Sequence, residues 1–282
     1  MGCALKRLRD FGFNTDNKVY VVAEIGINHG GDIKTAERLI GSAASAGVDA
    51  VKFQTYITQK RLKKDSPIFD ILKKCELPFK AFKELKDCAE GYNVEFFSTA
   101  FDDESIDYLE SINVSLYKVA SFDVINPNFL RKIAKTKKTV ILSTGMSALD
   151  EIKKAYAILS EKTKNIALLH CISAYPTQAN DANLAAIYSL KDNFDCVIGQ
   201  SDHTDGIEVP LYAVAVGAQV IEKHYKISKE MHCVDASVSI TEEQMKHLIR
   251  KIRRLEQILG EGRLGITDAQ QECKIYRRQS VG

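Results

Sequence analysis

The sequence lacks a strong charge of either sign and a long apolar run. Its 282 residues include 39 lysines and arginines and 37 aspartates and glutamates, so the formal net charge is +2 at pH 7. Binding to nucleic acid or an anionic membrane through bulk charge requires a larger basic excess. No apolar run approaches the length of a bilayer span, and residues 1–18 lack the apolar centre of a signal peptide. These absences predict a cytoplasmic protein with no nucleic-acid or membrane partner.

Paired cysteines are missing as well. The seven cysteines are an odd number, and no two of them form a Cys-x-x-Cys pair. This pattern argues against a disulfide framework and a structural zinc site, and it favours reduced thiols in a cytosolic protein. Cys171 follows an apolar run and could line a pocket, but nothing in the sequence around it indicates a stabilised thiolate.

Nucleotide-binding motifs and interdomain linkers are also absent. The chain has neither a G-x-G-x-x-G nor a P-loop pattern, which argues against a dinucleotide or nucleoside-triphosphate fold. What the chain does contain is a short β-branched run followed by a helical pattern, repeated along its length. The expected strands lie at 19–23, 50–54, 94–99, 115–119, 139–144, 166–171, 197–199 and 220–225.

Eight strand–helix units in unbroken order predict a closed (β/α)8 TIM barrel rather than an open doubly wound sheet. The chain length agrees with the usual size of such a barrel, about 250 residues. Asp32 can cap the first helix, Pro127 suits a first helical turn, and helices are expected at 182–190 and 242–258. We predict an N-terminal extension at 1–18, the barrel at 19–260 and a C-terminal tail at 261–282.

Two histidines follow consecutive predicted strands in the same way. His203 lies near the end of the run from Val197 to Thr204, and His224 lies near the end of the run that begins at Val220. Two neutral imidazoles that leave neighbouring strands on the same face could share one divalent metal such as Mn, Fe, Co or Zn. The alternative is that each histidine caps its strand by bonding a loop carbonyl. The matching design of the two strands favours the metal.

The remaining strand ends carry polar side chains, and the carboxyl ends of barrel strands build the active site. Converging hydroxyl and ammonium groups resemble a phosphate cradle, in which Gln54 is also expected to bind substrate. The alternatives are helix caps for the hydroxyls and escape to solvent for the lysines. These strand-end residues are Glu24, Lys52, Gln54, Ser98, Thr99, Lys118, Ser121, Ser143, Thr144, His170, Ser201 and Glu222.

Glu24 is the acid/base candidate. A carboxylate at the end of a buried strand is desolvated, which moves its pKa towards proton chemistry at neutral pH. A salt bridge to a neighbouring lysine is an equally consistent interpretation. The residues alone therefore predict a barrel enzyme that holds a phosphate-bearing small molecule beside a two-histidine metal site, and they do not determine the reaction.

Motifs stand at nearly every predicted strand end: AEIGINH at 23–29, VKFQT at 51–55, STAF at 98–101, YKVAS at 117–121, LSTGM at 142–146, YPT at 175–177 and GQSDHT at 199–204. Taken together, these segments resemble the N-acetylneuraminate (sialic acid) synthase family. The resemblance implies a TIM barrel that condenses phosphoenolpyruvate with an open-chain N-acetylated amino-hexose, giving a nine-carbon ulosonic acid and phosphate.

The resemblance also implies roles for individual residues. It implies that His203 and His224 bind Mn²⁺, which would hold the aldehyde oxygen of the sugar. Glu24 would be the acid/base near the reacting carbons, and Asp235 and Tyr175 would lie beside the sugar. The residues implied to hold phosphoenolpyruvate are Lys52, Thr99, Lys118, Ser121 and Ser201.

Several positions on the sugar side depart from the sialic acid synthases. Ser173 stands where asparagine is frequent and Asp123 where glutamate is usual, and both are expected to bind substrate. Phe53 stands where some members have histidine, and Cys233–Val234 replaces a common Gly-Pro. These departures predict a dideoxy or diacetamido sugar, as in pseudaminic or legionaminic acid synthases, rather than N-acetylmannosamine.

The family usually continues into a small antifreeze-like domain that reaches across a dimer and supplies an arginine to the partner's sugar. We therefore expect the tail at 261–282 to be the stub of a missing antifreeze-like domain, and the protein to be a homodimer. Two alternatives remain open from the sequence: another phosphoenolpyruvate- or pyruvate-dependent barrel aldolase or synthase, and a catalytically silent barrel that acts as a scaffold subunit.

Overall fold

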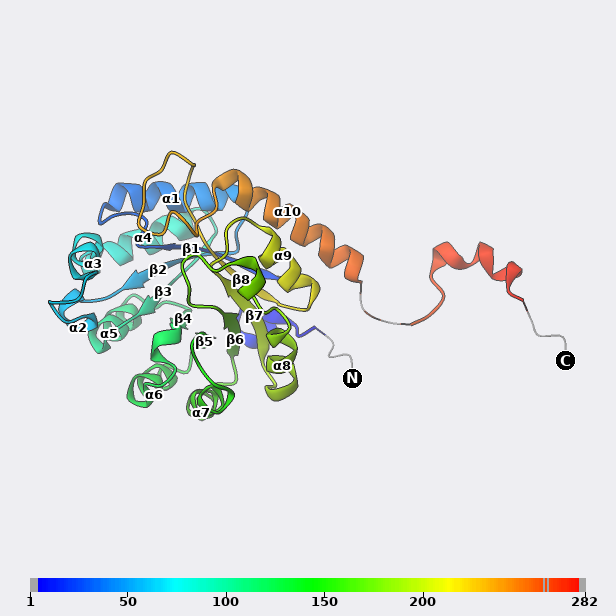
Figure 1. Cartoon of the computed structure of the whole chain (residues 1–282), viewed down its shortest axis with the longest axis horizontal. Coiled ribbons are helices and arrows are strands. Elements are labelled where there is room, and N and C mark those ends of the chain that lie inside the picture. Colours follow the sequence, from blue (N-terminus) through cyan, green and yellow to red (C-terminus); the bar gives the residue numbers. More distant parts are fainter. Residues whose placement is uncertain (1–4, 261, 263, 279–282) are drawn as a thin grey trace.

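Eight parallel strands form a closed barrel in the order β1 to β8 (Figure 1), which confirms the predicted TIM barrel. The computed structural model describes residues 5–260, 262 and 264–278; the parts of the predicted extension and tail at 1–4, 261, 263 and 279–282 lie outside the described residues. The strands are β1 Tyr20–Gly26, β2 Ala50–Thr55, β3 Glu95–Ala100, β4 Leu116–Val119, β5 Thr139–Ser143, β6 Ile166–Cys171, β7 Val197–Asp202 and β8 Val220–His224.

The strands are buried on both faces because their side chains alternate between two apolar layers. On β1, Tyr20 and Val22 point into the barrel, where they join an interior cluster with residues such as Phe97. Val21 and Ala23 point outward and pack in the larger cluster beneath the helices. Strands covered on both sides need apolar residues at every position, which explains their near-continuous β-branched runs.

Residues 5–18 contribute to the barrel core. A short 3₁₀ helix, Leu8–Phe11, lies at the amino end of the barrel, and Leu8 and Phe13 are each only 2 % exposed. Both side chains belong to the interior cluster, together with Tyr20. This segment therefore covers the amino end of the barrel, while the carboxyl end stays accessible.

The helices form the outer layer around the barrel (Figure 1). The expected caps are present, since the Asp32 side chain accepts a hydrogen bond from the Thr35 amide and Pro127 begins its helix. The helices are α1 Ile33–Ala46, α2 Thr58–Arg61, α3 Phe69–Cys75, α4 Phe79–Gly91, α5 Asp103–Ser111, α6 Pro127–Lys135, α7 Leu149–Ser160, α8 Ala186–Asn193, α9 Glu208–Ala215 and α10 Glu242–Leu259.

Two segments differ from the sequence-based expectation. The segment between β2 and α4 contains two short helices, α2 and α3, which a simple strand–helix repeat does not include. The helix expected at 182–190 instead begins at Ala186, after a 3₁₀ turn at Ala179–Asp181. One reason is tertiary: the His170 side chain on β6 hydrogen-bonds the Ala182 carbonyl at 2.8 Å, which ties that part of the backbone to the strand.

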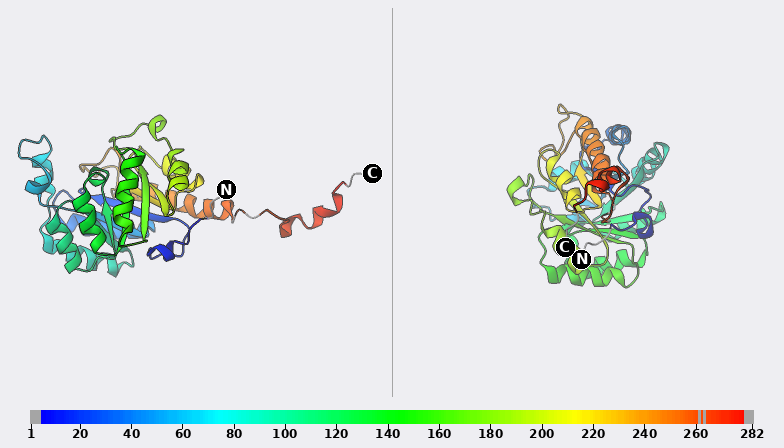
Figure 2. Two further views of the ribbon diagram at one scale, coloured as in Figure 1. Left: turned by 90° about the horizontal axis from the view of Figure 1, so that it is seen from below. Right: turned by 90° about the vertical axis from the view of Figure 1, so that its right-hand side faces the viewer.

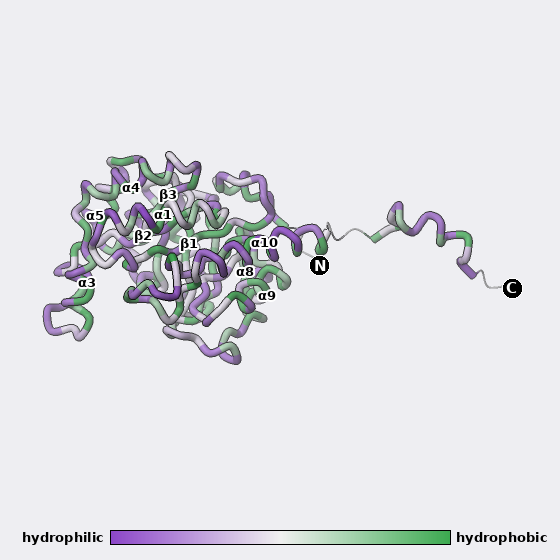
Figure 3. Tube along the Cα trace, turned by 90° about the horizontal axis from the view of Figure 1, so that it is seen from above, coloured by the Kyte–Doolittle hydropathy of each residue, from purple (hydrophilic) through white to green (hydrophobic). Residues whose placement is uncertain are grey.

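The last helix, α10, packs one apolar side against the barrel through residues such as Met245, Leu248 and Ile252. Figure 3 shows much of α10 in purple, the colour of hydrophilic residues. Figure 2 shows that the segment after α10 extends away from the barrel, and residues 264–278 are exposed. In the described part of the chain, every helix is too short or too polar to cross a membrane.

Gly199 allows β7 and β8 to approach each other, and this predicts the effect of Gly199→Ala. A Cβ atom at this position would overlap the Val220 carbonyl oxygen and meet Leu169 Cδ2 at 2.7 Å. We expect a loss of about 1–3 kcal/mol in the free energy of unfolding, the usual cost of overpacking. Denaturant unfolding followed by circular dichroism measures this loss.

Gly91→Ala is the matched control, because no atom lies within 4 Å of the position of a Cβ at Gly91 in α4. This control should retain the stability of the unaltered protein or exceed it slightly. Equal stabilities for the two variants would contradict the close approach of β7 and β8.

Candidate active site

A cavity of about 400 Å³ opens at the carboxyl ends of the barrel strands. Each of the eight strands, or the loop that directly follows it, contributes to the lining. The predicted site residues that line it are Glu24, Lys52, Gln54, Thr99, Lys118, Ser121, Ser173, Tyr175, Ser201, His203, His224 and Asp235. The structure thus brings the predicted set together, with the exception of Asp123.

The floor of the cavity is a cluster of two lysines and two glutamates. Lys52 Nζ lies 2.7 Å from Glu24 Oε2 and 3.8 Å from Glu222 Oε1, and Lys118 Nζ lies 3.9 Å from the same Glu222 oxygen. None of the four side chains is more than 6 % exposed. Charges at such depth are tolerated only when opposite charges and hydrogen bonds compensate them. The salt bridge expected as one interpretation of Glu24 is therefore present.

The two ammonium groups have different surroundings. Burial by itself would lower the pKa of Lys52, but the carboxylates of Glu222 and Glu24 outweigh it and raise that pKa. For Lys118, burial dominates and lowers the pKa, although Glu222 opposes this effect. Lys118 is thus the less compensated cation, and its Nζ donates to Ser143 Oγ at 2.7 Å. A bound anion would stabilise its charged form.

Burial also raises the pKa of Glu24, against the opposing effect of Lys52. One carboxylate oxygen, Oε1, accepts a hydrogen bond from Gln54 Nε2 at 3.1 Å, and the other faces Lys52. Glu24 is 2 % exposed and lines the cavity. A carboxyl group held in this way can exchange a proton with a bound molecule.

Hydroxyl groups and one glycine complete the floor. Thr99 Oγ1 accepts from Lys52 Nζ at 3.1 Å, and Ser121 Oγ accepts from the Gly145 amide at 3.0 Å. A Cβ atom on Gly145 would lie 2.9 Å from Ser121 Oγ and would overlap Ser173 Oγ. Only glycine leaves this space open, so the hydroxyl groups of Thr99 and Ser121 stay in place to donate to a small anion.

His203 and His224 lie side by side in the cavity lining, with ring centroids 5.3 Å apart. Metal–nitrogen bonds of about 2.1 Å allow two imidazoles at this separation to bind the same ion. Tyr175 packs against both rings, tilted over His203 at 4.1 Å and edge-on to His224 at 6.0 Å between centroids. The tyrosine therefore restricts how either ring can turn.

The protonation state of His203 suits a metal ligand. Its Nδ1 donates a hydrogen bond to the Ile172 carbonyl at 2.8 Å, so this histidine does bond a loop carbonyl, as the alternative interpretation proposed. That bond leaves Nε2 with its lone pair. Burial lowers the pKa of His203 to about 3, which keeps the ring neutral, and neutral imidazole is the form that binds metals.

His224 offers a second donor atom. Its Nδ1 is buried without a hydrogen-bond partner and lies 3.4 Å from Asp235 Oδ2. In the described ranges, no three His, Cys, Asp or Glu side chains gather closely enough to hold a metal by themselves. The two histidines, one of which has a buried nitrogen without a hydrogen-bond partner, therefore fit as ligands of a divalent cation. The remaining coordination positions of such a cation would be open to water or substrate.

The structure adds two residues to the predicted set. Glu222 was identified only as a strand end, yet it compensates both buried lysines. Arg61, at the end of α2, donates to Gln54 Oε1 at 3.0 Å, and its guanidinium lies 3.5 Å from the Phe101 ring centroid. No local sequence signal marks Arg61, because its place at the cavity depends on how the segment between β2 and α4 folds back.

Some polar strand-end residues do not face the cavity, although the sequence suggested that they converge there. Ser98 Oγ bonds Thr55 Oγ1 at 2.7 Å, and Thr144 Oγ1 donates to the Leu169 carbonyl at 3.1 Å. The reason is strand alternation: Ser98 and Thr99 are neighbours, so only one of them can point inward.

His170 and Asp123 also lie outside this lining. His170 hydrogen-bonds the Ala182 carbonyl, as expected for a histidine that caps its strand. Asp123, which the sequence predicted to bind substrate, ends the 3₁₀ turn Ser121–Asp123 and accepts from Asn126 Nδ2 at 3.5 Å. Burial raises the pKa of Asp123.

The mouth of the cavity is apolar. Ile68, Ile71, Phe122 and Val234 all line it, and they are 47 %, 45 %, 61 % and 45 % exposed. Large apolar side chains with this exposure can cover the apolar groups of a bound molecule. The cavity therefore combines a charged floor with an apolar rim.

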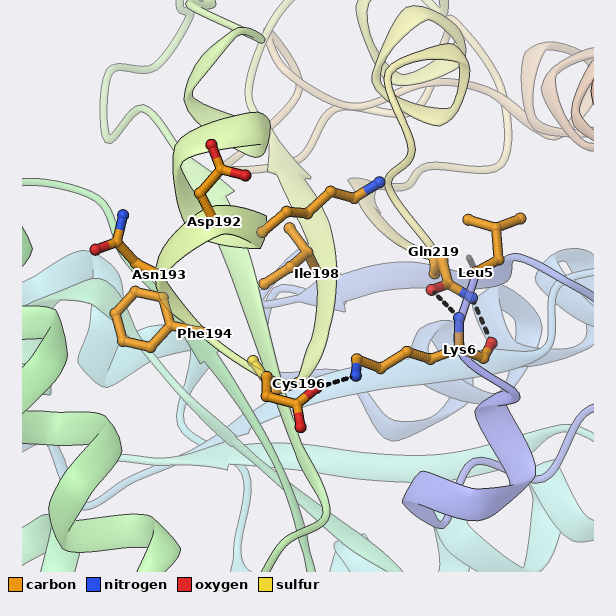
Figure 4. A pocket seen from close by; sticks show the side chains of 10 residues that line it. Leu5, Lys6, Asp192, Asn193, Phe194, Cys196, Ile198 and Gln219 are labelled. Carbon is orange, nitrogen blue, oxygen red and sulfur yellow. Dashed lines mark hydrogen bonds and ion pairs between the residues drawn. The ribbon is translucent and has the colours of Figure 1, made fainter. Parts of the chain in front are cut away.

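A second cavity, of about 300 Å³, lies at the amino ends of β7 and β8 (Figure 4). The Lys6 ammonium pairs with Asp195 there, and the Lys6 backbone exchanges two hydrogen bonds with the Gln219 side chain. These contacts attach the N-terminal segment to the barrel. Catalytic residues of TIM barrels lie at the opposite end, which makes the first cavity the candidate active site.

Known proteins share this sequence and this architecture. A family model described as the NeuB family matches residues 39–264. An N,N'-diacetyllegionaminic acid synthase of Campylobacter jejuni is 40 % identical over 94 % of this chain and 84 % of its own, and a pseudaminic acid synthase of Campylobacter jejuni is 34 % identical over 94 % and 82 %. The crystal structure of N-acetylneuraminic acid synthetase from Leptospira borgpetersenii superposes with a TM-score of 0.90 at 39 % identity, covering 92 % of this chain and 91 % of that one.

The charge cluster predicts the behaviour of a Glu222→Gln variant. The amide keeps the shape of the side chain but leaves Lys52 and Lys118 short of negative charge in a buried place. We expect the free energy of unfolding to fall by about 3 kcal/mol, as for other broken buried pairs. We also expect added phosphoenolpyruvate to raise the melting temperature of the variant more than that of the unaltered protein, because the anion replaces the lost charge.

Both quantities can be measured by denaturant unfolding and by thermal unfolding with and without phosphoenolpyruvate. Glu90→Gln is the control, since Glu90 pairs with Lys86 on the surface of α4 with 57 % of its side chain exposed. Its stability should change by less than about 1 kcal/mol. A Glu222→Gln variant as stable as this control would show that Glu222 does not compensate the lysines.

Proposed function

The chain belongs to the NeuB family, and from this membership we propose that it condenses phosphoenolpyruvate with an open-chain N-acetylated amino-hexose to give a nine-carbon ulosonic acid and phosphate. Members of this family are phosphoenolpyruvate-condensing transferases. The observation that carries the proposal is one cavity with a pair of buried lysines at its floor and two histidine rings 5.3 Å apart beside them.

Phosphoenolpyruvate binds at the charged floor in this proposal. Its phosphate and carboxylate supply negative charge that would compensate Lys118, and the hydroxyl groups of Thr99 and Ser121 can donate hydrogen bonds to it. Charge-assisted hydrogen bonds of this kind are stronger than neutral ones. The floor would hold the methylene carbon (C3) of phosphoenolpyruvate in a single orientation towards the mouth, which makes carbon–carbon bond formation effectively unimolecular.

The sugar occupies the outer half of the cavity. His203 and His224 would hold a divalent cation such as Mn²⁺, and the chemistry that it supplies when bound is polarisation of the sugar aldehyde. Asp235, which lies beside His224, and Tyr175 would contact the sugar hydroxyls. The methylene carbon (C3) of phosphoenolpyruvate would then attack the aldehyde carbon, which leaves positive charge on C2, the carbon that carries the phosphate.

Glu24 would act as the acid/base group. After the new bond forms, water adds to C2, the carbon that carries the phosphate, and the tetrahedral intermediate expels phosphate. Glu24 can take the proton from that water, because burial raises its pKa against the opposing effect of Lys52 and its side chain lines the cavity. Gln54, which Arg61 orients, keeps one oxygen of Glu24 in place.

We propose a 2,4-diacetamido-2,4,6-trideoxyhexose as the sugar. Such a sugar carries two acetamido methyl groups and a C6 methyl group, which suit the apolar rim of Ile68, Ile71, Phe122 and Val234. Identities of 40 % to a diacetyllegionaminic acid synthase and 39 % to an N-acetylneuraminic acid synthetase do not separate the two sugars, so the apolar rim carries this choice. A cytoplasmic location and a homodimeric state belong to the proposal as well.

A substrate panel tests the sugar. The protein is incubated with phosphoenolpyruvate, Mn²⁺ and either diacetamido-trideoxyhexoses or N-acetylmannosamine, and products are identified by mass. We expect the diacetamido sugars to give a nine-carbon acid with one phosphate released per product, since the rim buries their methyl groups. Faster turnover of N-acetylmannosamine would contradict the sugar proposed, and product formation from pyruvate without phosphate release would indicate an aldolase instead.

Glu24→Gln tests the acid/base role. General acid–base groups contribute about 10²–10⁴-fold to rate, so we expect kcat to fall by at least about 100-fold. The control is Glu95→Gln, because Glu95 begins β3 at the amino end of the barrel and accepts a hydrogen bond from the Tyr20 hydroxyl. Unchanged turnover in Glu24→Gln would remove Glu24 from the mechanism and would favour a purely structural salt bridge with Lys52.

A further inference from the structure

A fully buried ion pair lies directly behind the two histidines. Lys223 Nζ is 2.6 Å from Asp202 Oδ2, and the side chains are 0 % and 1 % exposed. Asp202 precedes His203 on the chain, and Lys223 precedes His224. Because side chains alternate along a strand, Lys223 points away from the cavity that its neighbour His224 lines.

The ion pair holds the backbone on both sides of His203. Lys223 Nζ also donates to the carbonyl oxygen of Thr204, the residue after His203. Asp202 in turn accepts from Thr204 Oγ1 at 2.9 Å and from Gln200 Nε2 at 3.2 Å. The residues before and after His203 are therefore both bound to the lysine that precedes His224.

This connection is placed where the strand ladder ends. The last backbone pair between β7 and β8 is Asp202 with Lys223, so His203 lies one residue beyond the ladder. The carbonyl of His203 accepts from the Thr177 amide at 2.9 Å, which attaches it to the loop after β6 and not to β8. The contacts that tie the His203 segment to β8 at this point are those of Lys223.

Packing alone does not account for charges at this position. A buried ion pair adds little net stability compared with well-packed apolar residues of similar volume, because desolvation offsets the attraction. A directional pair, however, defines the spacing between the two chain segments that it joins. The outer face of β7 and β8 thus carries an ion pair at a place where apolar side chains of similar volume would stabilise the fold as well. We call this Asp202–Lys223 pair the clamp.

We propose that Asp202 and Lys223 are positioning residues that set the separation of His203 and His224 for a shared divalent cation. This inference rests on the metal role in the proposed function. The clamp acts through the backbone of the two histidines and does not touch the cation. Residues that orient metal ligands typically change metal affinity by about 10–100-fold when they are mutated.

The test is the affinity for Mn²⁺ alone, measured without substrates from the electron paramagnetic resonance signal of free Mn²⁺. The double variant Asp202→Leu/Lys223→Met removes both charges together and leaves neither of them buried without a partner. We expect it to unfold cooperatively near the temperature of the unaltered protein and to bind Mn²⁺ at least about tenfold more weakly. Thr204→Val, which removes only the hydroxyl that bonds Asp202, should weaken binding by a smaller factor.

The control is Arg253→Met, which breaks the 3.0 Å ion pair with Asp49 at the amino end of the barrel and should leave Mn²⁺ affinity unchanged. If the unaltered protein binds no Mn²⁺, the metal role in the proposed function fails and this inference fails with it. If the unaltered protein binds Mn²⁺ and the double variant binds it as tightly, the clamp is overturned while the proposed function stands. Should the double variant not fold, unchanged affinity in Thr204→Val overturns the clamp.

Discussion

Compensation of charge inside the barrel is the constraint on which the rest of the site depends. Lys52, Lys118, Glu24 and Glu222 come from four different strands, and each is almost completely removed from water. Burying any one of them alone would cost several kcal/mol, and together they satisfy one another. This is possible only when β8 closes against β1, because closure brings Glu222 to the lysines of β2 and β4.

The interior of the barrel is divided along its axis. The amino half is apolar, built from side chains such as Tyr20 and Phe97 and covered by Leu8 and Phe13 from the N-terminal segment. The carboxyl half holds the charges. Burial of the apolar half stabilises the fold and offsets the cost of burying charges in the other half. The apolar half also closes the amino end of the barrel, which leaves the carboxyl end, with its lysines and histidines, as the open one.

In the proposed function, two layers of polar residues act together. The inner layer faces the cavity and carries the groups that would meet phosphoenolpyruvate, the cation and the sugar. Arg61, which also lines the cavity, orients Gln54. The outer layer lies behind the inner one, where Lys223 and Asp202 connect β7 with β8. A binding site with precise distances needs such support, because the first layer alone leaves its side chains free to rotate.

The sequence by itself determined the barrel, the order of its strands and most of the polar residues at its mouth, because strand–helix periodicity is local and parallel strands in a closed barrel carry their carboxyl ends to one rim. Only the tertiary structure decided which neighbours face inward, as with Ser98 and Thr99, and which groups pair, as with Glu222 and the two lysines. It alone brought Arg61 to the cavity. The physical reason is that distances between side chains on different strands depend on register and closure, which no local pattern of residues encodes.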